Sequence, residues 1–228
     1  EVRPVARQSL LQAADVTTPA SLTALETKGL LRTFTVETSR FDADTAQPSD
    51  PDVACTSLPM LSVEQNTALQ GIRAAFEQKD VVLLHGVTSS GKTEIYIHLI
   101  DEALRSGRQA LMLVPEIALT TQLTRRLQRV FGQRVVIYHS KFSDGKRVEV
   151  WKKLLKNTSP CVIIGARSAV FLPFHSLGMV IVDEEHEPSY KQYDPAPRYN
   201  ARDVATVVAR MCGAKTLLGS ATPSVETY

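Results

Sequence analysis

The sequence has few cysteines and no long hydrophobic run, and these absences exclude several classes of protein. Its three cysteines, Cys55, Cys161 and Cys212, lie far apart and show no CxxC or Cys/His spacing. This argues against a disulfide scaffold or a zinc site within this segment and favours a reducing, cytoplasmic location. Apolar runs are short and broken by glycine, proline or charge, so we expect no membrane-spanning helix. The first residues, EVRPVARQSL, lack the apolar centre of a signal peptide.

The net charge is also small, and the composition is that of an ordinary globular protein. The chain has 26 basic and 24 acidic residues, a net charge of +2. There is no global basic field, so binding to nucleic acid would depend on local patches. With 43% hydrophobic residues, a chain of 228 residues can bury a core in one or two domains. Because it starts without methionine and stops at ATPSVETY, we expect a fragment of a longer protein.

One change in composition divides the chain. Residues 38–59 are rich in Asp, Ser, Thr and Pro and have too little apolar surface to pack alone. We therefore assign residues 41–60 to a linker between an N-terminal segment, 1–40, and a main domain, 61–228.

The N-terminal segment shows a helix–turn–helix–strand pattern. One helix is predicted over Val5–Ala14, and a second begins after Thr18 and Pro19 and stops at Gly29. Residues 31–37 then alternate apolar and polar, as a half-buried strand does. The pattern is typical of the end of a winged-helix domain. A small packing subdomain without nucleic-acid contacts is an equally good interpretation.

After the linker, short apolar strands alternate with helical stretches. The predicted strands are Val81–Leu84, Ala110–Val114, Val135–Tyr138, Val162–Ile164, Met179–Val182 and Thr216–Leu218. The predicted helices include Lys92–Ser106, Thr120–Phe131, Lys146–Asn157 and Arg202–Met211. Continuous β-branched strands separated by helices indicate an α/β fold with an open, doubly wound parallel sheet. Ligands of such sheets bind at the carboxyl ends of the strands.

A phosphate-binding motif follows the first of these strands. Residues Gly86–Thr93, GVTSSGKT, match G-x-x-x-x-G-K-[ST] between a strand and a helix. The backbone of such a loop, here with Gly86, Ser89, Ser90 and Gly91, turns its N–H groups toward a phosphate. Lys92 would reach the β- and γ-phosphates, and the hydroxyl of Thr93 would ligate Mg²⁺. The alternative, an ordinary glycine-containing turn, rarely has all these features together.

A second group of candidate residues follows the strand 179–182. Asp183 would hold Mg²⁺ through water, and Glu184 would orient and deprotonate the attacking water. Without a phosphate loop upstream, such acids would often be a solvated sheet edge. For His186, a link to another element and simple exposure are both open.

The last predicted strand runs into small hydroxyl residues, GSATP. Their small side chains allow close backbone approach, and the hydroxyls of Ser220 and Thr222 could bond the acids of the neighbouring strand. Taken alone, the segment predicts a strand and a turn.

Three motifs resemble those of superfamily 2 helicases and translocases in sequence and order. They are GVTSSGKTE (residues 86–94), DEEH (183–186) and GSAT (219–222). Three further stretches are similar to one branch, the primosomal replication-restart DNA helicases of bacteria: LVPEIALTTQ, YHS and IGARSAVFLPF. Leu61–Gln65 looks like the motif in which a glutamine, here Gln65, reads adenine, because an amide both donates and accepts. The resemblance covers residues 61–228.

The resemblance implies a fold, an activity and partners. The main domain would be the first RecA-like lobe, an open, mostly parallel twisted sheet with helices on both faces, which uses ATP and Mg²⁺. The whole protein would be a 3′-to-5′ DNA helicase acting on single-stranded and forked DNA to restart stalled replication, with primosome proteins and single-strand-binding protein as partners and no membrane association. The second lobe with its arginine finger, and a zinc module, would lie outside this chain, so the fragment alone would be nearly inactive.

The chain departs from the family pattern at three positions, one of which is Thr121, where proline is common. Ser89 stands where glycine is usual in the phosphate loop, which would slightly alter the backbone conformation that surrounds the phosphate. Ala166 stands where threonine is common, which puts one hydroxyl contact to DNA in doubt.

A loop between DEEH and GSAT supplies the candidate DNA contacts. Translocases combine polar groups that follow the backbone with aromatic platforms, and residues 188–203 resemble the family's aromatic-rich loop. A surface loop whose tyrosines pack on the domain is the alternative. The candidates are Arg167, Ser168, Tyr190, Lys191, Tyr193, Arg198 and Tyr199.

Two basic helices are better explained as solvated faces. One carries Arg125, Arg126 and Arg129, and the other carries lysines, with Trp151 and Leu155 expected to turn inward. Two functions stay open: an ATP-driven DNA motor, and a phosphate-loop ATPase switch that acts on protein partners without translocating DNA.

Overall fold

The computed structural model describes residues 20–30, 32, 57–87, 90–140, 142–156 and 158–227. The chain forms two compact units, Glu1–Asp42 and Ala43–Tyr228, and each is described by itself. In the first unit, helix α2 spans Ala20–Thr27 and ends before Gly29, which has a φ of 71°. The predicted helix 5–14, nearly all of the strand 31–37 and the linker up to residue 56 lie outside the described residues. The winged-helix assignment and the domain boundaries therefore stay predictions.

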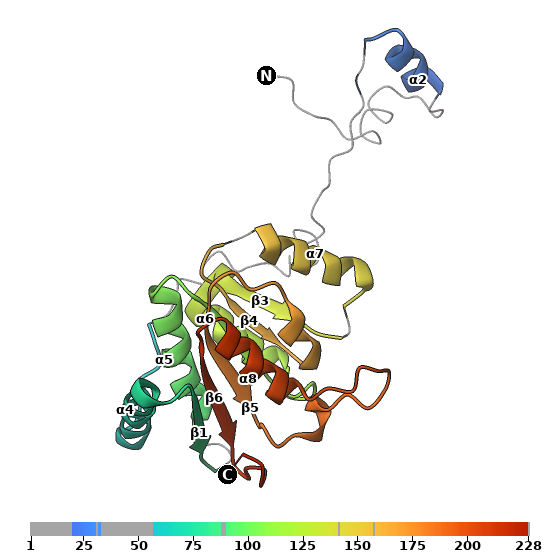
Figure 1. The fold of residues 1–228 in the computed structure, drawn as a ribbon. Coiled ribbons are helices and arrows are strands. Elements are labelled where there is room, and N and C mark those ends of the chain that lie inside the picture. The colour runs from blue at the N-terminus through green and yellow to red at the C-terminus, as the bar shows by residue number, and fades with distance from the viewer. Residues whose placement is uncertain are drawn as a thin grey trace. The chain divides into compact units, whose positions relative to one another are not determined.

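The second unit is built on a sheet of six parallel strands (Figure 1). The strands are β1 (Val81–His85), β2 (Gln109–Leu113), β3 (Val135–Tyr138), β4 (Val162–Gly165), β5 (Leu177–Asp183) and β6 (Lys215–Ser220). Their order in the sheet is β1-β6-β5-β2-β4-β3. At the carboxyl ends, His85 pairs with Ser220 and Asp183 pairs with Gly219. This order therefore places the phosphate loop, GSAT and DEEH side by side.

Helices cover both faces of this sheet (Figure 1). Helices α4 (Val63–Gln78), α5 (Lys92–Arg105) and α6 (Thr121–Phe131) share one core cluster with alternate strand residues. The intervening strand residues, such as Leu111 and Leu113 of β2, point to the opposite face of the sheet and are buried there. Helix α7 (Asp144–Lys156) packs against β3, and α8 (Ala201–Met211) packs against β5 and β6. Burial on both faces explains why the strands are apolar throughout.

The predicted α/β fold is confirmed, and the predicted strands and helices match the observed ones closely. The sequence analysis did not predict α4, which begins at a capping box between Ser62 and Gln65. It also did not predict three short 3-10 turns: η1 (Gly132–Arg134), η2 (Arg167–Phe171) and η3 (Pro188–Tyr190). In the described parts of the chain, no helix has the length and apolarity needed to cross a membrane.

The predicted orientation of α7 is wrong. Trp151 and Leu155 are 44% and 46% exposed, whereas Val150 and Leu154 are buried. Residues four apart share one helix face, so Val150 and Leu154 together face the sheet. Five large apolar side chains lie close together in VEVWKKLL, residues 148–155, and packing against β3 decides which of them are buried.

Candidate nucleotide-binding site

The phosphate loop joins β1 to α5, and its glycines are explained by their surroundings. Gly91 caps α5 with a φ of 79°, and a Cβ there would lie 2.0 Å from the Gln65 amide nitrogen. The loop is tied to the neighbouring strand because the Gly86 N–H donates to the Ser220 carbonyl at 3.0 Å. Thr88 and Ser89 lie outside the described residues, so the effect of serine at 89 stays a prediction.

Lys92 has the environment expected of a phosphate-binding lysine. It is 8% exposed, and its ammonium donates to the Gly86 carbonyl at 2.9 Å. It also forms an ion pair with Glu184, with 3.6 Å between Nζ and Oε1. Thr93 follows in the first turn of α5 and is half-buried, while Ser90 is exposed at the loop surface. The structure thus brings the phosphate loop and the acidic motif into direct contact.

Asp183 is held by two tyrosines at the end of β5. The Tyr96 hydroxyl donates to Asp183 Oδ1 at 2.9 Å, and the Tyr190 hydroxyl donates to the Asp183 backbone carbonyl at 2.6 Å. Burial raises the pKa of Asp183, while the hydrogen bond from Tyr96 acts in the opposite direction. Both rings are fully buried, so the carboxylate has a defined position.

Tyr96 was not among the site residues predicted from the sequence. It lies one helical turn after Lys92, on the same face of α5, which is the signal that could have indicated it. The position of the Tyr96 side chain also depends on Gly219, because a Cβ at residue 219 would lie 1.9 Å from the Tyr96 hydroxyl. The glycine of GSAT therefore makes room for the tyrosine that bonds Asp183.

Glu184 has an unusual backbone conformation. Among the described residues it is the one non-glycine residue with positive φ, at 48°. Such a conformation costs free energy and persists where the surrounding structure holds it, often in a functional site. Besides Lys92, the Glu184 carboxylate lies 3.7 Å from His186 Nδ1.

His186 and the GSAT segment are joined directly. His186 Nδ1 is hydrogen-bonded to Ser220 Oγ at 2.7 Å, and the Thr222 N–H donates to the same oxygen at 3.1 Å. The histidine thus connects the acidic strand to β6, which favours the linking interpretation over simple exposure. The hydroxyl of Ser220 bonds the histidine rather than an acid.

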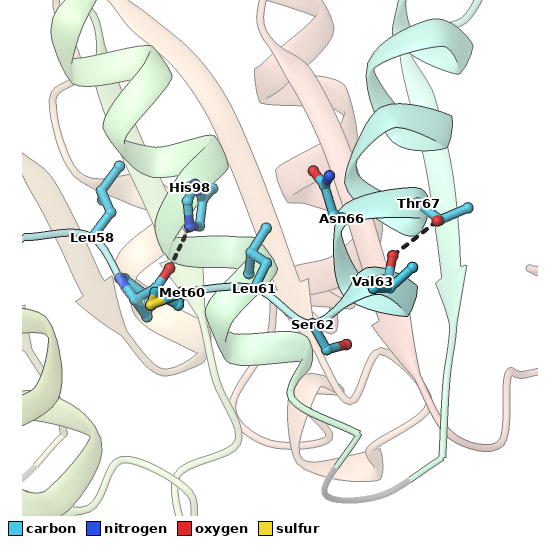
Figure 2. Close-up of a pocket in the computed structure, with 9 residues that line it drawn as sticks. Leu58, Met60, Leu61, Ser62, Val63, Asn66, Thr67 and His98 are labelled. Carbon is cyan, nitrogen blue, oxygen red and sulfur yellow. Dashed lines mark hydrogen bonds between the residues drawn. The ribbon is translucent and has the colours of Figure 1, made fainter.

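Gln65 lies beside the phosphate loop and stabilises the start of α4. Its Oε1 accepts from the Ser62 N–H at 2.8 Å, and its Nε2 lies 3.4 Å from the Ser90 and Gly91 carbonyls. A separate pocket of about 500 Å³, which Gln65 does not line, opens at the start of α4 (Figure 2). One wall is fixed by His98 on α5, whose Nε2 is hydrogen-bonded to the Pro59 carbonyl at 2.9 Å.

The aromatic-rich loop forms a narrow antiparallel connection between η3 and α8. Lys191 and Asn200 form a β-bridge, and Arg167 Nη1 donates to the Lys191 carbonyl at 3.0 Å. Tyr193 is 67% exposed, and Arg198 is also exposed. Other candidates are less open: Ser168, Lys191 and Tyr199 are half-buried.

Tyr190 does not have the position expected for a base-stacking residue. Its side chain is 1% exposed, and its hydroxyl is occupied by the Asp183 carbonyl. Here the packing alternative holds, because the ring fills the core below the loop. Tyr199 is held by Arg167 and lies edge-on to Phe171, with ring centroids 5.0 Å apart. In the described ranges, no group of three or more His, Cys, Asp or Glu residues could hold a metal ion.

Comparison with known proteins gives a consistent result. A family model described as DEAD/DEAH box helicase matches residues 64–228. The chain is 42% identical over 215 residues to replication restart protein PriA of Bacillus subtilis, which is 93% of this chain and 26% of that protein. It is 41% identical over 206 residues to PriA of Haemophilus influenzae, 90% of this chain and 28% of the relative. A solved structure of RecG bound to a three-way DNA junction aligns with a TM-score of 0.52 at 26% identity, over 75% of this chain and 22% of that one.

These comparisons fit the geometry of the site. The chain spans about a quarter of the length of the curated relatives that it matches. The RecA-like fold and the resemblance to replication-restart helicases are confirmed, and a helicase domain of this family implies the use of a nucleotide and Mg²⁺ in general. Since the family model covers most of the chain, including the phosphate loop, DEEH and GSAT, the chain belongs to the DEAD/DEAH box helicase family.

Proposed function

We propose that this chain is the nucleotide-binding lobe of an ATP-dependent 3′-to-5′ DNA helicase that restarts replication at stalled forks. The observation that carries the proposal is the contact between Lys92 and Glu184 beside a fixed Asp183. The relatives are replication restart proteins, which supply the biological process. Single-stranded and forked DNA, primosome proteins and single-strand-binding protein are the partners that we propose for the whole protein, acting in the cytoplasm.

Each residue of the site has a chemical role in this proposal. Lys92 exchanges its contact with Glu184 for the β- and γ-phosphates, which leaves the Glu184 carboxylate available to orient and deprotonate water. Thr93 and Asp183 fit Mg²⁺ because a hydroxyl and a carboxylate are the hard oxygen ligands it prefers. When bound there, Mg²⁺ would neutralise phosphate charge. Gln65, whose amide lies beside the Ser90 and Gly91 carbonyls, reads adenine.

The hydrogen bond from Tyr96 should set the acidic limit of hydrolysis. That bond lowers the pKa of Asp183 against the effect of burial, so Tyr96→Phe should raise this pKa further. If hydrolysis needs ionised Asp183, the acidic limb of the pH–rate profile then moves to higher pH. The profile is measured on the intact protein, with Tyr138→Phe at the far strand β3 as the control. An unmoved acidic limb in the Tyr96 variant would contradict this role.

DNA contact should depend on the exposed part of the aromatic-rich loop. Tyr193→Ala in the intact protein should weaken single-strand binding by about 1–3 kcal/mol if the ring stacks on a base. Tyr190→Phe should leave DNA affinity unchanged, because the ring is buried and stays in place. Fluorescence anisotropy with labelled oligothymidylate measures both variants. Equal affinity of wild type and Tyr193→Ala for the oligothymidylate would contradict the stacking role of Tyr193.

The proposed function is tested by hydrolysis of ATP by the intact protein with and without single-stranded DNA. We expect DNA to stimulate hydrolysis, and residues 1–228 alone to hydrolyse little, because an arginine from a second lobe contributes roughly 10³–10⁵ in rate in phosphate-loop enzymes. A switch that acts on protein partners predicts no stimulation by DNA. The match to a DEAD/DEAH box helicase family model does not favour that alternative.

A further inference from the structure

A fully buried carboxylate lies next to Glu184. The Glu185 side chain has no exposed surface and accepts hydrogen bonds from three partners. Ser224 donates from its N–H at 2.8 Å and from its hydroxyl at 3.2 Å, and Arg202 Nη1 and the Thr227 hydroxyl each donate at 2.9 Å. The carboxylate also lies 2.9 Å from the guanidinium of Arg202 as an ion pair. Both of its oxygens are therefore paired.

The partners of Glu185 come from the two other segments that carry motifs of the site. Arg202 lies in the first turn of α8, two residues after Asn200, which closes the aromatic-rich loop by its bridge to Lys191. Ser224 and Thr227 belong to the turn that follows β6 and GSAT. Arg202 Nη1 also donates to both of their hydroxyls, at 2.8 Å and 3.1 Å. One carboxylate thus joins the acidic strand, the loop and the exit from β6.

Stability alone gives a weak reason for such a cluster. Taking a carboxylate and a guanidinium out of water is costly, and apolar residues of similar volume often replace a buried ion pair without loss of stability. A buried ion pair does fix direction and distance, because its hydrogen bonds have narrow geometry. The Glu185 backbone is fixed as well, since its N–H donates to the Gly219 carbonyl at 3.0 Å.

We infer that Glu185 is a positioning residue that transmits the state of the aromatic-rich loop to Glu184 through Arg202. A displacement of the start of α8 moves Arg202. Because Arg202 is hydrogen-bonded to the Glu185 carboxylate, Glu185 is displaced with it, and Glu185 is the chain neighbour of Glu184. The position of Glu184 is sensitive to such a displacement because its backbone is already in a strained, left-handed conformation. The inference rests on the proposed function and names a route by which DNA contact regulates the same site.

The test uses Glu185→Gln, Arg202→Gln and the double variant in the intact protein. For each we measure the affinity for a fluorescent ADP analogue, the melting temperature, and the ratio of hydrolysis with oligothymidylate to hydrolysis without it. Each single variant should keep nucleotide affinity within about twofold and lose about tenfold in the stimulation ratio. The double variant should lose no more than the worse single one, because both changes break the same coupling.

Two further variants keep the inference falsifiable. Thr227→Val removes one hydrogen bond from the carboxylate while keeping the shape, and it should lower the stimulation ratio even if Glu185→Gln fails to fold. Arg73→Gln is the control, because it breaks an exposed ion pair with Glu102 on α4 and α5 and should leave the ratio unchanged.

The outcomes separate this inference from the proposed function. A lower melting temperature with a normal stimulation ratio in folded Glu185→Gln or Thr227→Val would overturn the positioning role alone. Additive losses in the double variant would also overturn it. A wild-type protein that DNA does not stimulate would contradict the proposed function, and the inference with it.

Discussion

Replacing Lys92 by alanine is expected to weaken ADP binding by about 10- to 100-fold, the largest effect on nucleotide affinity that we predict for a single side chain. A hydrogen bond to a charged group contributes about 1.5–3 kcal/mol, and the ammonium of Lys92 is the buried cation of the phosphate loop. The change also removes the contacts of Lys92 to the Gly86 carbonyl and to Glu184, which stabilise the conformation of the phosphate loop. Isothermal titration calorimetry with ADP measures the loss.

The control for this experiment is Lys79→Ala, at the exposed end of α4. It removes a positive charge of the same type from the same unit, and it should leave ADP affinity unchanged. Equal affinity of wild type and Lys92→Ala would contradict the assignment of the phosphate loop. A loss of the same size in both variants would show that net charge, and not the position of Lys92, governs binding.

Replacing Glu184 by glutamine is expected to slow hydrolysis by about 10²–10⁴-fold while nucleotide affinity stays similar. The rate falls because glutamine cannot accept a proton from water, and general base catalysis typically contributes a factor of this size. Affinity is retained because Lys92, freed from its ion pair with the acid, still meets the phosphates. Single-turnover hydrolysis and ADP titration on the intact protein separate the two effects.

Glu187→Gln provides the matched control for Glu184→Gln. Glu187 lies three residues further on, is half-buried, and its N–H donates to the Glu184 carbonyl, which the change leaves intact. It should keep the wild-type rate within about twofold, as expected for a substitution outside the reacting groups. Hydrolysis that survives in Glu184→Gln would assign the base to another residue and require a different reading of DEEH.

Several features of this protein were determined by local sequence alone. The apolar strands are continuous because both faces of the sheet are covered, so each strand is visible as a short β-branched run, such as Val162–Ile164. The phosphate loop is equally local, because glycines and a lysine at fixed spacing are needed wherever a backbone turns around a phosphate. Because ligands of such sheets bind at the carboxyl ends of the strands, the candidate residues were expected just after the strands; the strand order that places Asp183 and Ser220 beside the loop came from the structure.

The tertiary structure alone decided which side chains support these motifs. Tyr96, Glu185 and Arg202 are ordinary residues in sequence, and they became partners because α5, β5 and α8 meet at the carboxyl ends of the strands. The aromatic-rich loop illustrates the same limit: composition could not tell buried Tyr190 from exposed Tyr193. A pattern reports the local backbone, whereas burial and pairing depend on residues far apart in the chain that approach each other only when the sheet has formed.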